Sequence, residues 1–233
     1  MCIRDSLTLP GPLPLEIRRN YSSSALSDNE FGHGWKLAYF PYLVVGDVTG
    51  GSQFIYGAEM DGSVIAFRRD ASNTNLFKPG TSDNPSLKNL HDGGTGSVAN
   101  AMNNRLVKSV EGADTIYTLS GPNGQTRRFK VQSFPVGTVT RSRPYLTIWQ
   151  DAQGNTLTFT YYTSPTDSRY GQLKQISANN GNFAGFDYDE AGHIIEAWTG
   201  DGRRVTYSYD SQGDLRTVTL PDGAVHSYEY EQE

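Results

Sequence analysis

The hydrophobic residues in the last third of the chain follow the period of a β-strand. In residues 204–209 every second side chain is apolar or aromatic, as Val205, Tyr207 and Tyr209 illustrate, and this alternation is typical of a strand with one buried face. The Asp-Ser-Gln-Gly sequence that follows favours a turn, because Asp bonds its own backbone and Gly accepts positive φ. A second strand rich in Thr and Val is predicted over 214–220, and Pro-Asp-Gly ends it. The pattern predicts a unit of strand, turn, strand and turn.

This unit recurs with a step of 21 residues, since Tyr188-Asp189 returns as Tyr209-Asp210 and again as Tyr230-Glu231. Two glycine series and two apolar series keep the same step: Gly171, Gly192 and Gly213; Gly181, Gly202 and Gly223; Leu173, Ile194 and Leu215; and Ile176, Ala197 and Val218. One unit earlier, Gly154 and Phe159 precede their equivalents by 27 residues. The difference indicates an insertion of about six residues within 163–169, which a surface loop tolerates.

The same pattern assigns the chain to the all-β class. No segment combines helix caps with apolar residues at helical spacing, and 25 glycines and 11 prolines interrupt most windows. Because a two-stranded unit cannot bury its tyrosine face alone, neighbouring units must pair edge to edge. We therefore predict a meandering antiparallel sheet of β-hairpins that spirals as a solenoid-like wall.

Composition and pattern divide the chain into five segments. These are residues 1–6, which have no apolar segment and which we interpret as non-native; 7–72, a β module; 73–104, a loop-rich insertion dominated by Ser, Asn, Asp, Gly and Pro; 105–150, degenerate repeat strands; and 151–233, the repeats of about 21 residues. The exact step fades upstream, but a glycine followed five residues later by an aromatic residue persists at Gly62/Phe67 and Gly124/Phe129.

Charge and hydropathy argue against two classes of partner. With a net charge of -5, the chain lacks the basic surface that binds phosphate backbones, so nucleic acid is not expected. The longest apolar run, residues 39–45, is broken by Pro41 and is far shorter than the roughly 20 residues of a membrane-spanning helix. The single cysteine, Cys2, can form no disulfide within the chain and gives no information on the compartment.

The order of residues in the repeat resembles the YD repeat of RHS proteins. Tyr188-Asp189 is followed by Gly192, Ile194 and Asp201-Gly202, and the resemblance covers roughly residues 151–233. The next copies supply the rest of the predicted signature, namely Tyr207, Tyr209, Asp210, Gly213, Leu215, Gly223, Tyr228 and Tyr230. The last copy departs from the family pattern with Glu231, and the first with Tyr162, where Asp is usual.

A second motif near the start resembles the module that precedes the repeats in bacterial RHS toxins. In that module an Arg-x-Tyr-x-Ser stretch is followed by Gly-x-Gly-Trp. This chain matches it with Arg19, Tyr21 and Ser23, then Gly32, Gly34 and Trp35. We interpret 7–72 as the RHS pre-repeat module on this basis, with Trp35 plugging the end of the β-core.

The resemblance implies a structural segment of a hollow β-shell that encloses a toxic C-terminal domain for delivery by a secretion system in interbacterial competition. The family's processing region and toxin lie after the repeats, so the chain is expected to be a fragment. Its expected partners are the remainder of its own chain and the secretion apparatus, and its expected location is secreted or at the bacterial cell surface. A segment of this kind, with an open sheet edge, is also expected to aggregate when expressed alone.

The alternative function is that of a secreted or cell-surface YD-repeat adhesin, in which exposed Tyr and Trp bind carbohydrate. Burial of the tyrosines in the repeat core favours the shell, whereas aligned exposed rings favour the adhesin. A hydrolase built on the Asp-rich turns is disfavoured, because no acid and base are paired.

The remaining candidate sites have ordinary structural interpretations. Asp187, Asp189 and Gly192 resemble the start of an EF-hand loop, but Trp198 stands where a bidentate Glu is needed, so we favour turn capping. The four histidines show no ligand spacing and are predicted as surface or turn residues: His33, His91, His193 and His226. We therefore predict no enzyme activity, no metal site and no cofactor.

Overall fold

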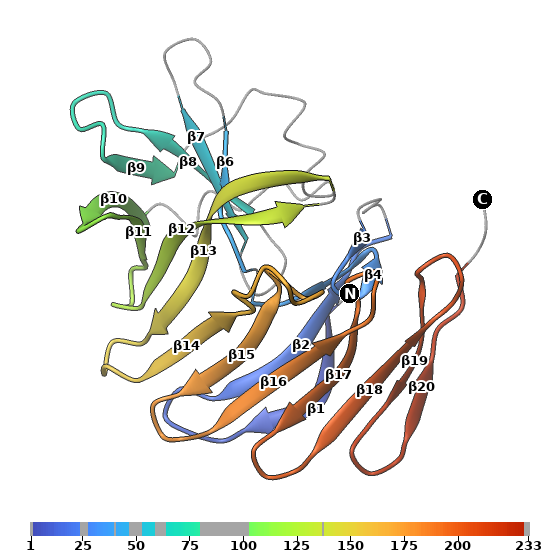
Figure 1. Cartoon of the computed structure of the whole chain (residues 1–233). Helices are drawn as coiled ribbons and strands as arrows, with labels where there is room; N and C mark the ends of the chain where they lie inside the picture. The colour runs from blue at the N-terminus through green and yellow to red at the C-terminus, as the bar shows by residue number, and fades with distance from the viewer. Residues whose placement is uncertain are drawn as a thin grey trace. The chain divides into compact units, whose positions relative to one another are not determined.

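The structure is a computed structural model, and it describes residues 2–23, 28–39, 41–46, 53–58, 64–79, 103–136 and 138–230. The chain forms two compact units, Tyr39–Phe159 and a second that combines Met1–Ala38 with Thr160–Glu233. We call them the middle unit and the terminal unit. Their described residues form strands and no helix (Figure 1). No helix suited to crossing a membrane is therefore present in the described part of the chain.

In the middle unit, antiparallel strands pair in sequence order. They are β6 (Val44–Val45), β7 (Phe54–Ala58), β8 (Val64–Arg69), β9 (Leu76–Pro79), β10 (Arg105–Glu111), β11 (Asp114–Ser120), β12 (Thr126–Val136), β13 (Val139–Gln150) and the first part of β14 (Thr156–Tyr161). The meander bonds back on itself, because Leu43 N donates to Pro144 O at 2.9 Å and Leu146 N donates to Pro41 O at 2.7 Å. The segment before β6 therefore pairs with β13.

The core of the middle unit is rich in aromatic residues. The Tyr39 ring lies edge-on to those of Trp149 and Phe159, with centroids 5.8 and 5.6 Å apart. One charged side chain is buried with them. The Arg127 guanidinium lies 4.9 Å from the centroid of the Trp149 ring, and these two residues are direct cross-strand partners on β12 and β13.

The terminal unit contains the regular repeats. Its meander continues with β15 (Leu173–Ala178), β16 (Phe183–Tyr188), β17 (Ile194–Thr199), β18 (Arg204–Tyr209), β19 (Leu215–Thr219) and β20 (Val225–Ser227). Strands β15 to β19 each bury one side, on which the repeat positions predicted to be apolar lie, whereas the three residues of β20 are exposed. Ile194, Ala197, Val205, Leu215 and Val218 are each 0% exposed.

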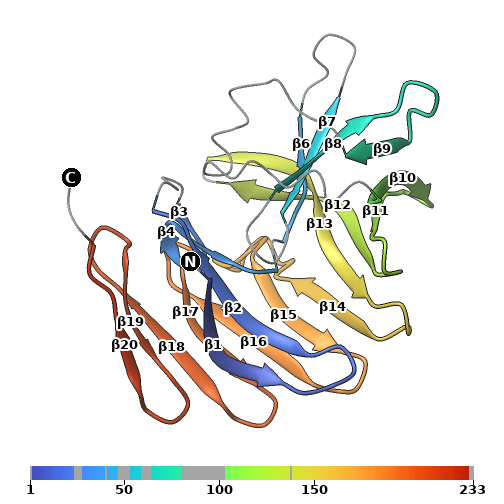
Figure 2. The same cartoon turned by 180° about the vertical axis from the view of Figure 1, so that it is seen from behind.

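A separate N-terminal sheet belongs to the same unit. It consists of β1 (Cys2–Leu9), β2 (Leu15–Tyr21) and β5 (Trp35–Leu37), in the order β1-β2-β5. Between β2 and β5 the chain forms a small hairpin of β3 (Asp28–Asn29) and β4 (Gly32–His33), visible beside the ends of the repeat strands (Figures 1 and 2). The side chains of this sheet form the other half of the terminal unit's core, since Leu7 and Ile17 are 0% exposed, and Phe31 of the hairpin is buried as completely.

The turns of the repeats follow the predicted chemistry. In the turn after β18, the Asp210 carboxylate accepts hydrogen bonds from Gln212 N and Asp214 N at 2.9 and 3.0 Å. Gly213 has a φ of 86°, a conformation that residues with a Cβ rarely adopt. The Asp carboxylates therefore cap the turns, and the glycine three residues later allows the chain to reverse.

The predicted all-β class and antiparallel meander are confirmed. The spiral course and the segment boundaries stay predictions.

Within the predicted insertion 73–104, Leu76–Pro79 forms β9 and residues 80–102 lie outside the described residues. Residues 2–6, interpreted as non-native, are the first part of β1. The sequence did not indicate that residues 1–38 group with the repeats, while 39–159 form a unit of their own.

Candidate functional site: the N-terminal sheet docked on the tyrosine repeats

The repeated tyrosines form a ladder of identical hydrogen bonds in the terminal unit. Tyr188 Oη donates to Leu173 O at 2.7 Å, and Tyr209 Oη donates to Ile194 O at 2.7 Å. Tyr230 Oη continues the series by donating to Leu215 O at 2.8 Å. Each acceptor lies 15 residues before its tyrosine in the sequence. The three acceptors are the first residues of β15, β17 and β19. The tyrosine of the YD motif thus ties its own repeat to the apolar position of the repeat before.

The degree of burial separates these rings. Tyr188 and Tyr207 are 8% and 5% exposed, and Tyr209, Tyr228 and Tyr230 are half-buried. Burial raises the pKa of Tyr188 and Tyr209 well above the ordinary range. Phenols in such surroundings stay protonated and serve as hydrogen-bond donors. The rings therefore pack in the repeat core, in the arrangement favoured for a structural role.

Arg19 of the pre-repeat motif enters the same core and is 1% exposed. Four aromatic rings surround its guanidinium. Two come from the N-terminal segment, with centroids 5.6 Å away for Phe31 and 4.8 Å for Trp35. The other two come from the repeats, at 5.3 Å for Tyr207 and 5.7 Å for Tyr228. This aromatic cage satisfies a buried cation through several ring faces at once.

Polar contacts support the cage. Arg19 Nη2 donates to Tyr228 Oη at 3.3 Å, and Trp35 Nε1 donates to Tyr230 Oη at 2.8 Å. The Tyr230 hydroxyl is therefore shared between the tyrosine ladder and the pre-repeat motif. Tyr21 packs against both rings, with centroids 4.8 Å from Trp35 and 6.2 Å from Tyr230. The two motifs that the sequence separates by nearly 200 residues thus meet in one cluster.

The β3–β4 hairpin docks on two repeat turns of the terminal unit. Ile194 N donates to Glu30 O at 2.7 Å. Gly32 approaches Gly213 so closely that a Cβ at position 32 would lie 2.3 Å from the Gly213 carbonyl oxygen. His193, which is 4% exposed, lies between this hairpin and the repeats and stacks on Tyr209. His193 lies in a repeat turn, one of the two places predicted for it, but it is not a surface residue, because the hairpin covers this turn.

The end of β1 and the β1–β2 turn contact the turns at the opposite ends of the repeat strands, through Asn182 and Arg203. Asn182 Nδ2 donates to Pro10 O at 2.8 Å, and both terminal nitrogens of Arg203 lie 3.3 Å from Thr8 O. The N-terminal sheet is therefore attached at both ends of the repeat strands as well as in the core.

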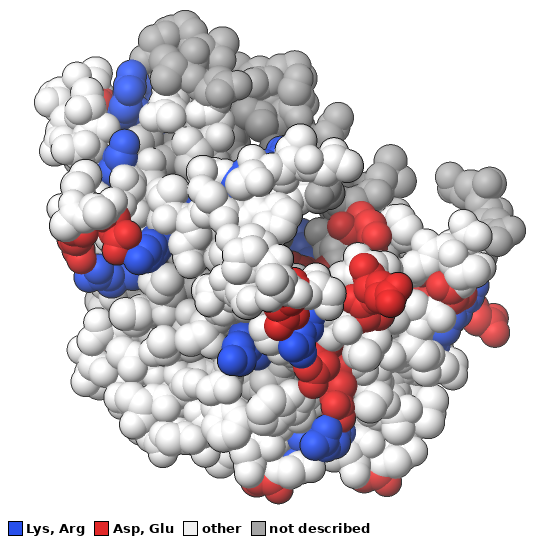
Figure 3. Space-filling model, in the orientation of Figure 1, with Lys and Arg blue, Asp and Glu red and all other residues white. Residues whose placement is uncertain are grey.

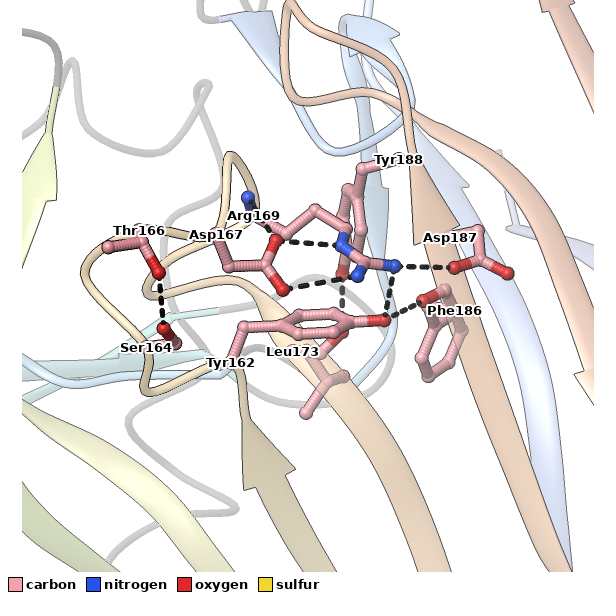
Figure 4. Close-up of polar contacts among 9 residues, drawn as sticks. All are labelled: Tyr162, Ser164, Thr166, Asp167, Arg169, Leu173, Phe186, Asp187 and Tyr188. Atoms are coloured by element: carbon pink, nitrogen blue, oxygen red, sulfur yellow. Dashed lines mark hydrogen bonds and ion pairs between the residues drawn. The ribbon is translucent and has the colours of Figure 1, made fainter.

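The first repeat has an enlarged turn, shown in Figure 4. Arg169 holds this loop with a two-pronged contact to Asp167, at 2.9 and 3.1 Å, and a 2.9 Å contact from Nη1 to Asp187 on β16. Its guanidinium also stacks on the Tyr162 ring at 4.1 Å. Hydrogen bonding from Arg169 lowers the pKa of Asp167. Tyr162, which replaces the usual Asp, donates to Phe186 O at 3.1 Å, so this copy replaces the capped turn by an arginine-centred network.

The opposite face of the repeat sheet has one aromatic pair. Phe183 and Trp198 are half-buried, and their ring centroids lie 5.6 Å apart. Two glycines make room for them, because a Cβ at Gly185 or at Gly200 would lie 2.5 Å from the Trp198 or the Phe183 ring. The residues one repeat later are Arg204 and Thr219, so the pair is not required by the repeat.

The structure accounts for the other predicted site residues as parts of turns and close contacts. Gly34 has a φ of 74° and lies against Ser22 and Tyr21, whereas Ser23 is exposed. Gly192, Gly202 and Gly223 occupy positive-φ turn positions, at 95°, 87° and 86°.

The carboxylates considered for calcium have protein partners, since Asp187 binds Arg169 and Asp189 accepts from His193 N. No group of three potential metal ligands occurs in the residues that the structure describes. On the face shown in Figure 3, some acidic and basic side chains lie side by side, and others form separate small acidic or basic groups. Sequence reasoning found the tyrosines, Arg19 and Trp35, but it missed Phe31, Arg203 and His193, which belong to no repeated pattern.

Comparison with known families agrees with this geometry. The model of the family described as RHS Repeat matches residues 188–225, which include two tyrosines of the ladder, Tyr188 and Tyr209. The model described as Domain of unknown function (DUF6531) matches residues 4–67, which include the Arg19 to Trp35 motif. No curated protein matches the chain. Two segments of the chain are therefore similar to an RHS repeat and, ahead of it, to a DUF6531 domain, which confirms its resemblance to the RHS/YD-repeat proteins.

Proposed function

We propose that this chain is a structural segment of an RHS-repeat β-shell that encloses a C-terminal toxin domain for secretion and interbacterial competition. In this proposal the N-terminal sheet is the cover of the first repeats. The observation that carries it is the aromatic cage, in which rings from both segments surround Arg19. A structural wall needs its first layer covered, because an open inner face would expose apolar surface.

The engagement of the repeat side chains also supports a structural role. The ladder hydroxyls of Tyr188, Tyr209 and Tyr230 are bonded to backbone carbonyls, and the turn carboxylates of Asp189 and Asp210 cap their own turns. Groups used in this way are not free for acid–base chemistry. The proposed partners are further repeats of the same polypeptide, the enclosed domain and a secretion apparatus, and the proposed location is secreted or at the cell surface.

The test uses the complete reading frame that contains this sequence. Further repeats of the same step, followed by a variable C-terminal domain, should be encoded downstream, and a small adjacent frame should protect cells from that domain. When the whole protein is digested with a broad-specificity protease, the C-terminal domain should survive far longer than the same domain expressed alone. Equal digestion rates would contradict enclosure, and a frame that ends in a cell-wall anchor would favour the adhesin.

The Phe183–Trp198 pair supports the adhesin as a second candidate. The two rings lie edge to face, with planes inclined by 87°, so a single ring of the pair would meet the apolar face of a sugar. Glu196 and Arg204, joined at 2.6 Å, provide polar groups near it. Under this alternative, Trp198→Ala should abolish binding to a glycan array, while Ile195→Ala, a change at an exposed residue of the same strand, should not. Absence of binding by the unaltered chain would reject this candidate and leave the shell proposal untouched.

A further inference from the structure

His193 is the buried titratable group that the proposed wall does not explain. Its side chain is 6% exposed, and both ring nitrogens face carboxylates. Nε2 lies 2.9 Å from Asp28 Oδ1, which belongs to the N-terminal hairpin. Nδ1 lies 3.4 Å from Asp189 Oδ2, which belongs to the repeat turn. The imidazole is therefore an ionic bridge between the two segments of the terminal unit.

The rest of the ring is enclosed as well. One face stacks on Tyr209, with centroids 4.7 Å apart and planes inclined by 27°. A Cβ at Gly213 would lie 3.1 Å from His193 Cε1, so the backbone of the next repeat turn approaches the ring edge. This packing fixes the imidazole plane, and the ring cannot turn away from either carboxylate without displacing the hairpin.

The charge state of the ring decides how many of these contacts are favourable. A neutral imidazole has one N–H, so it can donate to only one carboxylate, and its other nitrogen directs a lone pair at the second. An imidazolium donates from both nitrogens and attracts both anions. Protonation therefore adds one hydrogen bond and removes one repulsion across the interface.

Other titratable and charged groups surround His193 at the same interface. The hairpin contributes Asp28, Glu30 and His33, the repeat turns contribute Asp189 and Asp214, and β18 contributes Tyr209. His33 Nδ1 lies 3.3 Å from Asp214 Oδ1, which makes a second histidine–carboxylate pair across the same interface. Burial raises the pKa of Glu30, so this carboxyl also becomes easier to accommodate as the pH falls. The positive charge of Arg19, which acts on Tyr209, is constant over this range.

We propose that the β3–β4 hairpin is a pH-dependent latch on the repeats, closed when His193 is an imidazolium and loosened when it is neutral. Histidine is the side chain whose charge ordinarily changes within the physiological pH range, so the state of the latch is tested on both sides of neutrality. This inference concerns the docking of the hairpin alone and holds whether or not a toxin is enclosed.

The experiment follows the imidazole directly in the full chain. Long-range ¹H–¹⁵N NMR spectra of ¹⁵N-histidine-labelled protein, recorded from pH 5 to 8, report the charge and tautomer of each ring. The His193 signals, assigned by comparison with His193→Gln, should change from the imidazolium pattern to a single neutral tautomer. Amide signals of Asn29, Glu30 and Gly32 should broaden or shift over the same pH range.

A double-mutant cycle gives the second readout. Urea unfolding of the chain, Asp28→Asn, His193→Gln and the double variant is measured at pH 5.5 and at pH 7.5. The coupling between the two residues should multiply the folding equilibrium constant on the order of five-fold more at pH 5.5 than at pH 7.5. His226→Gln, a change at an exposed residue of β20, is the matched control and should leave the pH dependence unchanged.

Two results would overturn the latch. One is a His193 ring that keeps a single neutral form from pH 5 to 8, and the other is a coupling factor equal at both pH values. If His193→Gln does not fold, Asp28→Asn alone still tests the inference, because Asp28 is a partly exposed residue of the hairpin. Its loss should flatten the pH dependence of the Asn29 and Gly32 signals.

Discussion

Two buried arginines, one in each unit, show how the same contact has different consequences. Arg127 and Trp149 lie 4.9 Å apart on paired strands of one hairpin in the middle unit. Arg19 and Trp35 lie 4.8 Å apart in the terminal unit, but their cage is completed by rings from distant repeats. The first arrangement forms with its own hairpin, whereas the second requires that two separate sheets dock. A local contact stabilises an element, and a long-range contact holds a unit together.

Replacing each arginine by methionine should give the largest difference in stability between the two contacts. We expect Arg19→Met to reduce the free energy of unfolding by at least about 2 kcal/mol, because a desolvated cation loses several ring faces at once. Arg127→Met should remove about 1 kcal/mol, because one ring is involved. Urea unfolding followed by tryptophan fluorescence measures both. An equal loss for the two variants would contradict the distinction between docking and local contacts.

Two turn glycines sharpen the comparison at a smaller scale. Gly213 and Gly202 have almost the same φ, 86° and 87°, but a Cβ at position 213 would contact His193, whereas one at 202 would meet nothing within 4 Å. Gly202→Ala should therefore cost about 1 kcal/mol from backbone strain, and Gly213→Ala about 2 kcal/mol, since the docked hairpin must also move. Thermal denaturation of the two variants gives the ranking, and a larger loss for Gly202→Ala would show that the hairpin does not constrain this turn.

The tyrosine ladder provides the next test. Tyr188→Phe removes one hydrogen bond, to Leu173 O, and should cost about 1 kcal/mol, because a buried carbonyl loses its donor. Tyr230→Phe removes two hydrogen bonds, the one that Tyr230 Oη donates to Leu215 O and the one that it accepts from Trp35 Nε1. It should cost more than Tyr188→Phe, although Tyr230 is the more exposed ring. The reverse order in urea unfolding would indicate that burial, rather than contact with the N-terminal sheet, decides the loss.

Low pH should destabilise the turns of both units, and the loss of stability per residue should be the smallest of those predicted here. Hydrogen bonds from Arg203 lower the pKa of Asp201 to about 2, and those from Asn155 lower the pKa of Asp151. Carboxyls with lowered pKa values stabilise the fold above pH 4 and lose this contribution as the pH falls toward 2. Glu30, with its raised pKa, acts in the opposite sense. The melting temperature should therefore fall between pH 4 and 2, and Asp151→Asn should reduce that fall.

The sequence predicted what is local and periodic. The strand alternation around Val205 and Tyr207, the capped turns and the tyrosine series are all determined within one repeat or its neighbour. The docking of Arg19 and Trp35 on Tyr228 and Tyr230 was outside its reach, because these partners lie about 200 residues apart and no pattern links them. For the same reason the burial of His193 was not predicted, since the docked hairpin covers its turn.

The hydrogen-bond ladder also limits how such a protein can change its length in evolution. Each tyrosine bonds a carbonyl 15 residues earlier within a step of 21, so removing or duplicating 21 residues leaves every remaining rung with a partner. Removing residues 189–209, for example, would join Tyr188 directly to Asp210 and regenerate the motif. A deletion within the 15 residues that separate a tyrosine from its carbonyl would place that tyrosine opposite the wrong strand position. The extra residues of the first repeat lie within 163–169, outside the span of the Tyr188 rung. Recombination in whole units therefore preserves the ladder, and other changes of length are confined to the turns between rungs.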